Sequence, residues 1–413
     1  MAVRCYSLWS PFSPVRAVLR LQELMRPYAV TSPTHLSGLD SLRWYSALAV
    51  IITHVELHKR YHGLANVWDS VWIQNLGPAG VYFFFALSGF LITWLLKKER
   101  ANALSTVLPS FYRRRAWRIL PLYYLLVVLG FLVLPQFSAF AYPEGMSAGP
   151  NASELVAFVS AQPHVASSFL QRVPNISHLW SIGVELTFYS FWPLMVLRSR
   201  NLNRSIVVFI AGILTVKASL LLLGPALFHD PQPFFHFAAT LKFECMAVGA
   251  WFALRKGQRM ESLLSHPRTV WFALAAIPPV FLLYGTRLDN VVHLPLSVLF
   301  GIIVSGVAFS PGPPARFLDN RVSNYLGRIS YGIYCYHVAC ISLVLNVFPV
   351  RTLGTIWGNL ILYLCVLLLT TTVSAISFEF FELPISRRAR KVISVSPQVT
   401  QSISSTSHKS SAA

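Results

Sequence analysis

The sequence predicts an all-α protein, a polytopic transmembrane helix bundle of about ten spans with both chain ends in the cytoplasm. The first observation behind this prediction is composition. Apolar residues make up 54% of the 413 residues, charged residues only 12%, and the mean hydropathy is +0.55. Soluble domains carry about 25% charged residues. This composition also excludes disordered, collagen-like and coiled-coil chains.

The second observation is the spacing of the apolar stretches, because a spanning helix needs about 20 mostly apolar residues. The first stretch is the weakest candidate, since it is short and holds Arg43, His54 and Glu56. An additional stretch, Leu155–Leu170, is interrupted by a proline, and we expect it to be external or re-entrant. The ten predicted spans are Leu42–Leu57, Gly77–Leu96, Ile119–Leu134, Leu179–Leu197, Ile206–Ala226, Phe234–Leu254, Val270–Tyr284, Val292–Ser310, Ile329–Phe348 and Ile356–Phe380.

The third observation is the distribution of basic residues, which predicts the orientation. The chain holds 34 Lys and Arg against 15 Asp and Glu, a net charge of +19. With a cytoplasmic N-terminus and these spans, 27 basic residues fall in cytoplasmic segments, five outside and two within spans. Lys and Arg concentrate on the cytoplasmic side of membrane proteins. The excess charge therefore indicates orientation, and nucleic-acid binding is excluded because it needs a soluble basic surface.

The domain organisation follows from these spans, with residues 37–391 as one membrane domain. Residues 1–36 are predicted to be a cytoplasmic segment, because they lack the apolar core and cleavage site of a secretory signal. Residues 392–413 are rich in Ser and Thr, and we expect a disordered cytoplasmic tail. The five cysteines have neither metal-binding nor disulfide spacing, so no metal site is expected.

Ionisable residues near or inside spans are functional hypotheses, and the first group is Asp40, Arg43 and His54. Arg43 and His54 are about three helical turns apart, so they share a face at a separation of about 16 Å. A histidine exchanges protons near neutral pH, as a general base must. An interfacial histidine near the end of a short helix explains the pattern equally well.

Two arginines, Arg115 and Arg118, precede the third span and lie on one helix face. Paired guanidinium groups suit the phosphates of a nucleotide-bearing donor. A positive-inside anchor accounts for part of the same pattern.

The fourth span carries His178 and Glu185, which are two helical turns apart and so share a face. Glu185 can orient a histidine or bind an acceptor hydroxyl, or it can be a structural partner of Lys217 or Lys242. Lys242 and Glu244 are two residues apart and point to different sides of a helix. We therefore predict that these two residues form ion pairs with other spans.

The ninth span has a polar stripe of Ser330, Tyr334 and His337. Hydrogen bonding between helices explains this stripe as well as catalysis does.

Six motifs in one order resemble those of the acyltransferase 3 family of integral-membrane O-acyltransferases, over roughly Ser37 to Lys391. They are Gly38-Leu39-Asp40-Ser41-Leu42-Arg43 with His54, Gly80 to Ile92, Arg115-Ala116-Trp117-Arg118 with Ile119 to Tyr123, His178 to Pro193, Gly327 to Tyr331 with His337, and Glu382-Leu383-Pro384. Each motif alone is weak, whereas the ordered set on a chain of this kind is specific.

The resemblance implies an enzyme that takes an acyl group, usually acetyl, from cytoplasmic acyl-CoA and delivers it to a hydroxyl. Acyl-CoA is then a co-substrate, with no tightly bound cofactor. The expected partners are a cell-surface or exported glycan, or a lipid-linked sugar, together with membrane lipids. The expected location is the inner (plasma) membrane of a bacterium. The implied site residues are His54, Arg43 and Glu185 for catalysis, Arg115 and Arg118 for donor binding, and His178, Ser181 and Asp40 for substrate contact.

The chain departs from the family pattern after Glu185. Leu186 stands where a second glutamate is frequent, and Thr187 stands where a glutamine is frequent. If the second glutamate contributes to acceptor binding, this protein treats acceptors differently from other members of the family. We also expect no hydrolase-like periplasmic domain, which some members carry, after Val392.

A different class of protein, a secondary transporter for an anionic or sugar-linked solute, also fits part of the pattern. Buried Glu185, Lys242 and Glu244 are typical of such proteins. No internal repeat is evident, which weakens a transporter built from inverted repeats. Release or transfer of acetyl from acetyl-CoA separates the two classes.

Overall fold

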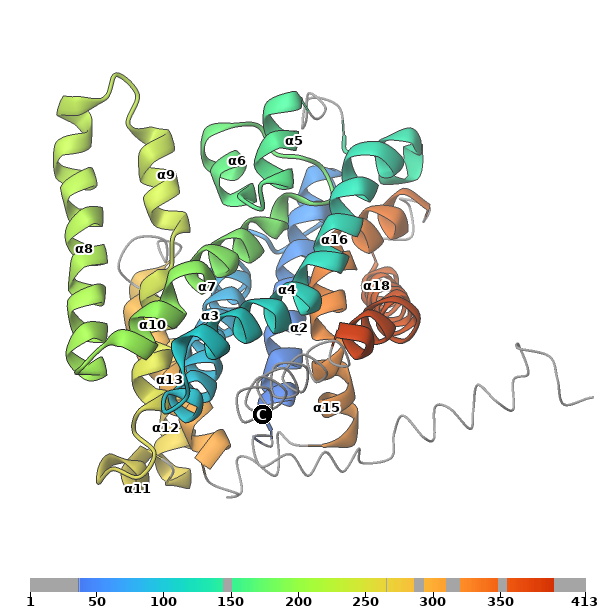
Figure 1. Ribbon diagram of the computed structural model, residues 1–413. Coiled ribbons are helices and arrows are strands. Elements are labelled where there is room, and N and C mark those ends of the chain that lie inside the picture. The colour runs from blue at the N-terminus through green and yellow to red at the C-terminus, as the bar shows by residue number, and fades with distance from the viewer. Residues whose placement is uncertain are drawn as a thin grey trace, which may run out of the picture.

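The computed structural model describes residue 36 and residues 38–143, 151–264, 266–285, 293–309, 320–347 and 355–389. Within these ranges the chain is helical and contains no strand. The helices pack side by side into one bundle (Figure 1). The predicted segment 1–36, apart from its last residue, and the predicted tail 392–413 lie outside the described residues.

Nine of the ten predicted spans coincide with a single long helix in the described chain. Their bounds are α2 (Leu39–Tyr61), α3 (Val71–Glu99), α4 (Leu104–Val128), α7 (Trp180–Arg198), α8 (Leu202–Leu227), α12 (Pro267–Tyr284), α13 (His293–Phe309), α16 (Ser330–Val347) and α18 (Ile356–Ser377). Shorter elements connect them, namely α5 (Ala152–Val159), α6 (Pro163–Phe169), α11 (Met260–Leu264) and α15 (Arg321–Arg328), together with the η4 turn (Ser177–Leu179).

The predicted sixth span, Phe234–Leu254, is not one helix. It divides into α9 (Gln232–Thr240) and α10 (Phe243–Ala253), with extended backbone at Leu241. In an unbroken helix, Lys242 and Glu244 would point to different sides. The break next to Lys242 lets each of these charged side chains reach its own neighbours. Lys242 lies 5.3 Å from the centre of the Tyr82 ring of α3, and Glu244 bonds to α8 and α13.

The stretch Leu155–Leu170 does not form a continuous span, as expected. It contributes to α5 and α6, which are separated by Ala161 in the left-handed region at φ 58° and by Pro163 at the start of α6. Neither short helix approaches the length that a bilayer requires.

Five helical segments among the described residues are long and apolar enough to cross a membrane: Val71–Glu99, Leu104–Gln136, Leu202–Leu227, Ser330–Val347 and Ile356–Ala389. The shorter helices α12 and α13 are also apolar. The protein is therefore an all-α integral membrane protein. The count of ten spans and the cytoplasmic location of both ends remain predictions.

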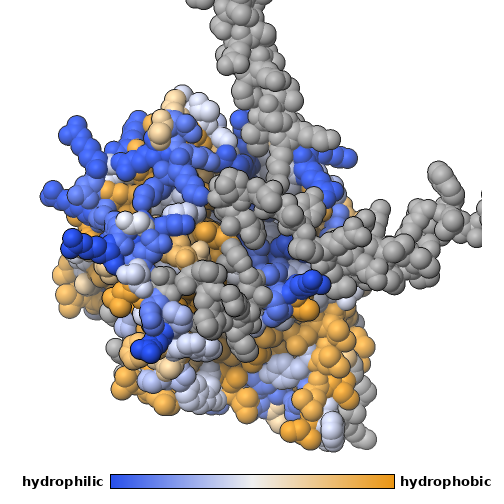
Figure 2. All heavy atoms as spheres, turned by 90° about the horizontal axis from the view of Figure 1, so that it is seen from below, coloured by the Kyte–Doolittle hydropathy of each residue, from blue (hydrophilic) through white to orange (hydrophobic). Residues whose placement is uncertain are grey.

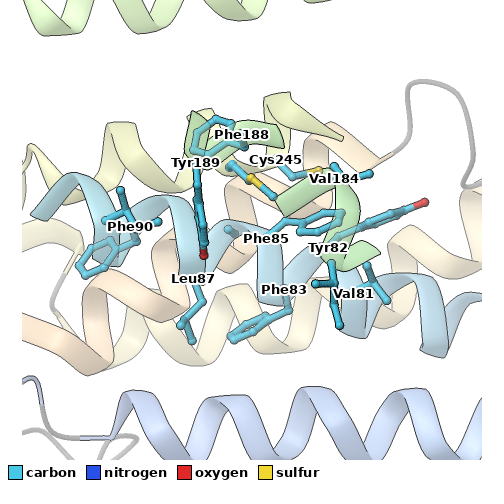
Figure 3. Close-up of a cluster of buried hydrophobic side chains, with 14 of the residues drawn as sticks. Val81, Tyr82, Phe83, Phe85, Leu87, Phe90, Val184, Phe188, Tyr189 and Cys245 are labelled. Carbon is cyan, nitrogen blue, oxygen red and sulfur yellow. The ribbon is translucent and has the colours of Figure 1, made fainter. Parts of the chain in front are cut away.

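Helix α3 forms the centre of the bundle and packs against α2, α7, α10 and α13. Its crossing with α10 is close, because a Cβ atom at Gly89 would lie 1.9 Å from the carbonyl oxygen of Met246. The reciprocal glycine, Gly249 of α10, would meet the Ala86 carbonyl at the same distance. Figure 3 shows the apolar cluster around this crossing, where Phe85 of α3, Phe188 of α7 and other buried side chains meet.

Helix α8 lies at the edge of the bundle beside α9 (Figure 1). Only 6% of its most apolar window is buried, and Val208, Leu222 and Leu227 are among its exposed residues. In a bilayer this surface faces lipid.

One end of the bundle gathers basic side chains from several helix ends. Lys98 and Lys256 both lie over the Trp94 ring, at 4.6 and 5.0 Å, and Arg255 donates to the Asn203 side chain at 2.5 Å. These contacts bring the ends of α3 and α10 and the start of α8 to one face. Figure 2, which views the molecule from below, shows hydrophilic side chains gathered on this face. We call it the basic face.

Candidate active site

Three histidines from separate elements meet inside the bundle. They are His54 of α2, His178 of η4 and His337 of α16. The His337 ring centre lies 4.9 Å from that of His54 and 4.7 Å from that of His178, and the other two rings are 6.5 Å apart. In this histidine cluster, His178 and His337 are 3% and 0% exposed, whereas His54 is half-buried.

Backbone carbonyls fix the tautomer of each ring, because a carbonyl oxygen only accepts. His54 Nδ1 lies 2.9 Å from the Val50 oxygen, and His337 Nδ1 lies 2.6 Å from the Tyr334 oxygen. Both Nδ1 atoms therefore carry hydrogen, and the neutral rings keep their lone pairs on Nε2. His337 Nε2 lies 3.4 Å from His54 Nδ1, so it shares that hydrogen with Val50. His54 Nε2 is left with a lone pair, as a base requires.

The third histidine has the opposite tautomer. His178 Nε2 lies 3.1 Å from the Cys335 carbonyl oxygen and therefore donates to it. Its buried Nδ1 has no hydrogen-bond partner in the described part of the chain. Ser181 and Tyr334 share a hydrogen bond of 2.6 Å, and the Tyr334 hydroxyl also bonds to the His178 carbonyl at 2.9 Å. Ser181, a predicted substrate contact, thus ties the start of α7 to α16.

Three arginines lie together near the start of α2. Arg43 bonds to Asp40 and is close enough to Arg118 for their charges to interact. The Arg115 guanidinium lies 5.7 Å from the Tyr189 ring and interacts electrostatically with Arg118 and Arg43. The predicted pair Arg115 and Arg118 therefore forms an arginine cluster with Arg43, which comes from a different helix. On α2 this cluster is separated from His54 by about 16 Å.

Glu185 lies beside this arginine cluster. It accepts hydrogen bonds from the hydroxyls of Ser88 and Tyr189, and its charge interacts with Arg115. Because Glu185 and His178 share a helix face, Glu185 was predicted as a possible partner that orients His178. No hydrogen bond joins the two residues in the described part of the chain. The 3₁₀ turn η4 precedes α7, and it directs His178 toward α16 instead.

Glu244 is the centre of a second buried polar cluster. It accepts hydrogen bonds from Lys217 of α8 and from His293 of α13. The prediction that Glu244 pairs with other spans is confirmed, and the alternative role of Lys217 as a partner of Glu185 is wrong. Both Glu244 and His293 are 0% exposed.

His337 was predicted to belong to a polar stripe, and its position beside His54 was not predicted. His58, which is 2% exposed and follows His54 by one turn of α2, was not predicted either. The signal that points to His58 is the regular spacing of His54, His58 and His62. Although three histidines converge, no group of His, Cys, Asp or Glu in the described ranges could hold a metal ion.

A family model of the acyltransferase domain matches residues 36–379. This range holds every helix from α2 to α18 and all the residues of the histidine and arginine clusters. The chain belongs to the acyltransferase 3 family. The resemblance carried by the six ordered motifs is thereby confirmed.

Several curated proteins are similar along most of this chain. O-acetyltransferase OatA of Staphylococcus aureus is 25% identical over 382 residues, which is 89% of this chain and 60% of the relative. A putative peptidoglycan O-acetyltransferase, YrhL of Bacillus subtilis, is 26% identical over 85% of this chain and 55% of its own length. Peptidoglycan O-acetyltransferase OatA of Listeria monocytogenes is 25% identical, with 86% and 56% covered. The chain thus spans less than two thirds of each relative. No solved structure matches significantly.

Proposed function

We propose that this acyltransferase 3 protein is an O-acetyltransferase of the bacterial plasma membrane. It moves an acetyl group from cytoplasmic acetyl-CoA to a hydroxyl of a cell-envelope glycan. One observation carries the proposal: the Val50 carbonyl accepts a hydrogen bond from His54 Nδ1, which leaves a lone pair on His54 Nε2. Arg43 lies on the same helix. The names of the relatives, which include peptidoglycan O-acetyltransferases, support a glycan acceptor.

The arginine cluster is the proposed donor site. Arg43, Arg115 and Arg118 supply three guanidinium groups, and the carboxylates whose charges interact with them are Asp40, Glu185 and Glu382. Guanidinium groups bind phosphates in a bidentate manner. CoA phosphates bound there place the thioester on the path from the basic face toward His54.

Two chemical routes lead from His54 to the product. In the direct route, Nε2 takes the proton of the acceptor hydroxyl while the hydroxyl oxygen attacks the thioester carbonyl. A C–O bond replaces the C–S bond, and the CoA thiolate then takes the proton from the imidazolium. In the relay route, Nε2 attacks the thioester carbonyl, so a C–N bond replaces the C–S bond and CoA leaves as the thiolate. The acceptor hydroxyl then attacks this acetyl-imidazolium, and a C–O bond replaces the C–N bond. The acceptor proton then passes to the CoA thiolate.

Replacing His54 tests the catalytic assignment. We predict that His54→Ala lowers CoA release from acetyl-CoA by the purified protein by about 10²–10⁴-fold, the usual contribution of a positioned base. His236→Ala is the matched control, because His236 is exposed and outside the histidine cluster. Full activity of His54→Ala with normal membrane expression would remove His54 from catalysis. A transporter would release no CoA in the wild type.

Conservative changes in the arginine cluster test the donor site. We predict that Arg115→Lys or Arg118→Lys raises the KM for acetyl-CoA about tenfold, equivalent to about 1.4 kcal/mol. Lysine keeps the charge but loses the planar bidentate geometry. Arg255→Lys, at the basic face but outside the cluster, should leave this KM unchanged. Equal KM values for all variants would contradict the assignment.

A further inference from the structure

A row of histidines leads along α2 away from the arginine cluster. His54, His58 and His62 follow one another at intervals of one turn, or about 6 Å each, on one helix face. His58 is 2% exposed, and its Nδ1 has no hydrogen-bond partner within the described residues. A buried polar atom without a partner is costly, which points to a group that joins it during function.

His62 ends this row at a pocket on the far side from the basic face. The pocket has a volume of about 350 Å³ and is lined by Tyr61, His62, Ala141, Tyr142, Pro143 and Asn346. Small-molecule sites usually measure about 300–1,000 Å³. The ring of His58 lies 5.6 Å from Tyr61 and 5.3 Å from Tyr142, measured between ring centres. His58 therefore stands between the pocket and the histidine cluster.

The lining indicates the chemistry of the ligand. The six lining residues carry hydroxyl, amide and imidazole groups, and a nearby charge is that of Arg172, which donates to the Tyr61 hydroxyl at 3.5 Å. Two tyrosine rings can pack on the C–H face of a sugar ring, and polar tips can bond to its hydroxyls. His62 Nδ1 donates to the His58 carbonyl at 2.8 Å, which leaves a buried, unpartnered Nε2 as an acceptor. Burial raises the pKa of Tyr142 to about 12, so its hydroxyl stays neutral.

We propose that this pocket binds one sugar unit of the acceptor and that a neighbouring unit carries the reacting hydroxyl past His58 toward His54, about 12 Å from His62. The inference rests on the proposed function, and it adds where the acceptor binds and which residues hold it. The donor and the acceptor then approach His54 from opposite ends of α2.

The experiment uses the purified full chain with acetyl-CoA and tetra-N-acetylchitotetraose as the acceptor probe. Tyr142→Ala should raise the KM for the probe at least tenfold and leave the KM for acetyl-CoA unchanged. Phe137→Ala is the matched control, because Phe137 is an aromatic residue 55% exposed in the same segment but outside the pocket. It should change neither KM.

Two further variants guard against a misfolded Tyr142→Ala protein. His62→Trp, which fills the pocket, should also raise the KM for the probe alone. His58→Phe keeps a ring against Tyr61 and Tyr142 but cannot bond to a hydroxyl, so it should lower kcat for transfer without changing the KM for acetyl-CoA. An unchanged kcat in His58→Phe would overturn the role of His58.

The remaining outcomes are also decisive. An unchanged KM for the probe in both pocket variants, or equal changes in both KM values, would overturn the pocket as the acceptor site. If the wild-type protein transfers no acetyl group to the probe, the proposal that the pocket binds an amino-sugar acceptor would be overturned. CoA release that depends on His54 would still support the proposed function in that case, so the two failures are distinguishable.

Discussion

A single carboxylate, Glu244, joins three helices in the apolar interior. It belongs to α10 and receives hydrogen bonds from Lys217 of α8 and His293 of α13. Its second oxygen is buried without a partner in the described part of the chain. An ion pair in such a place is strongly destabilised when one partner is removed, because the other charge stays buried.

We predict that Glu244→Gln lowers the free energy of unfolding by about 3–5 kcal/mol, through the uncompensated charge of Lys217. The double variant Glu244→Gln with Lys217→Met should recover much of the loss. Glu99→Gln is the control, because Glu99 pairs with Arg114 at an exposed site, where such pairs contribute about 0–1 kcal/mol. Thermal unfolding in detergent measures all three. Equal losses for Glu99→Gln and Glu244→Gln would contradict the argument.

At the scale of single residues, part of the candidate active site could be predicted from the sequence. The spacing of His54 from Arg43, and of Arg115 from Arg118, correctly indicated residues on common helix faces. Spacing along one helix does not say which other helix lies opposite, so the meeting of His54 with His178 and His337 was not predictable. Nor does the sequence reveal that carbonyls of Val50 and Tyr334 fix the two tautomers.

At the scale of elements, the crossing of α3 and α10 depends on two glycines. Gly89 and Gly249 face the opposite backbone so closely that no Cβ fits without moving a helix. Helix α10 also carries Glu244, which bonds to α8 and α13, so the position of α10 at this crossing affects the second buried polar cluster.

We predict that Gly89→Ala separates α3 from α10 and destabilises the protein by at least about 1–3 kcal/mol, the usual cost of overpacking. Gly212→Ala, in α8, meets nothing within 4 Å and should be neutral or stabilising by up to about 1 kcal/mol. Thermal unfolding of the two variants makes the comparison. A Gly89→Ala protein as stable as Gly212→Ala would show that the helices can move apart freely.

The apolar stretches predicted the positions of nearly all the long helices, because burial in lipid demands continuous apolar length. They failed at the boundary between α9 and α10. Hydropathy is summed over a window, so it does not register a single extended residue such as Leu241. The pair Lys242 and Glu244 was the available signal for a break.

At the scale of the whole molecule, basic residues from helix ends that are distant in sequence come together. Lys98, Arg255 and Lys256 share the basic face with the start of α8. The positions of the basic residues along the chain therefore predict that these residues gather on one face of the folded molecule. The pocket at Tyr61 and Tyr142 lies at the other end of α2.

We predict that the basic face is cytoplasmic. In a Cys5→Ser, Cys365→Ser background, a membrane-impermeant maleimide should label Phe137→Cys in intact spheroplasts. It should label Arg113→Cys only after permeabilisation, because Lys and Arg mark the cytoplasmic side. Arg113 is exposed, and the adjacent Arg114 pairs with Glu99 at the end of α3, at the basic face. Labelling in the opposite order would reverse the orientation and with it the proposed directions of donor and acceptor.

The position of α8 at the edge of the bundle has a mechanical consequence. Its apolar surface contacts lipid, while Lys217 on the same helix bonds to Glu244 in the interior. A helix tilts when the hydrocarbon layer becomes thinner than its apolar length. A thinner bilayer therefore favours a larger tilt of α8. Because Lys217 of α8 bonds to Glu244 of α10, we expect this tilt to shift α10 and its crossing with α3.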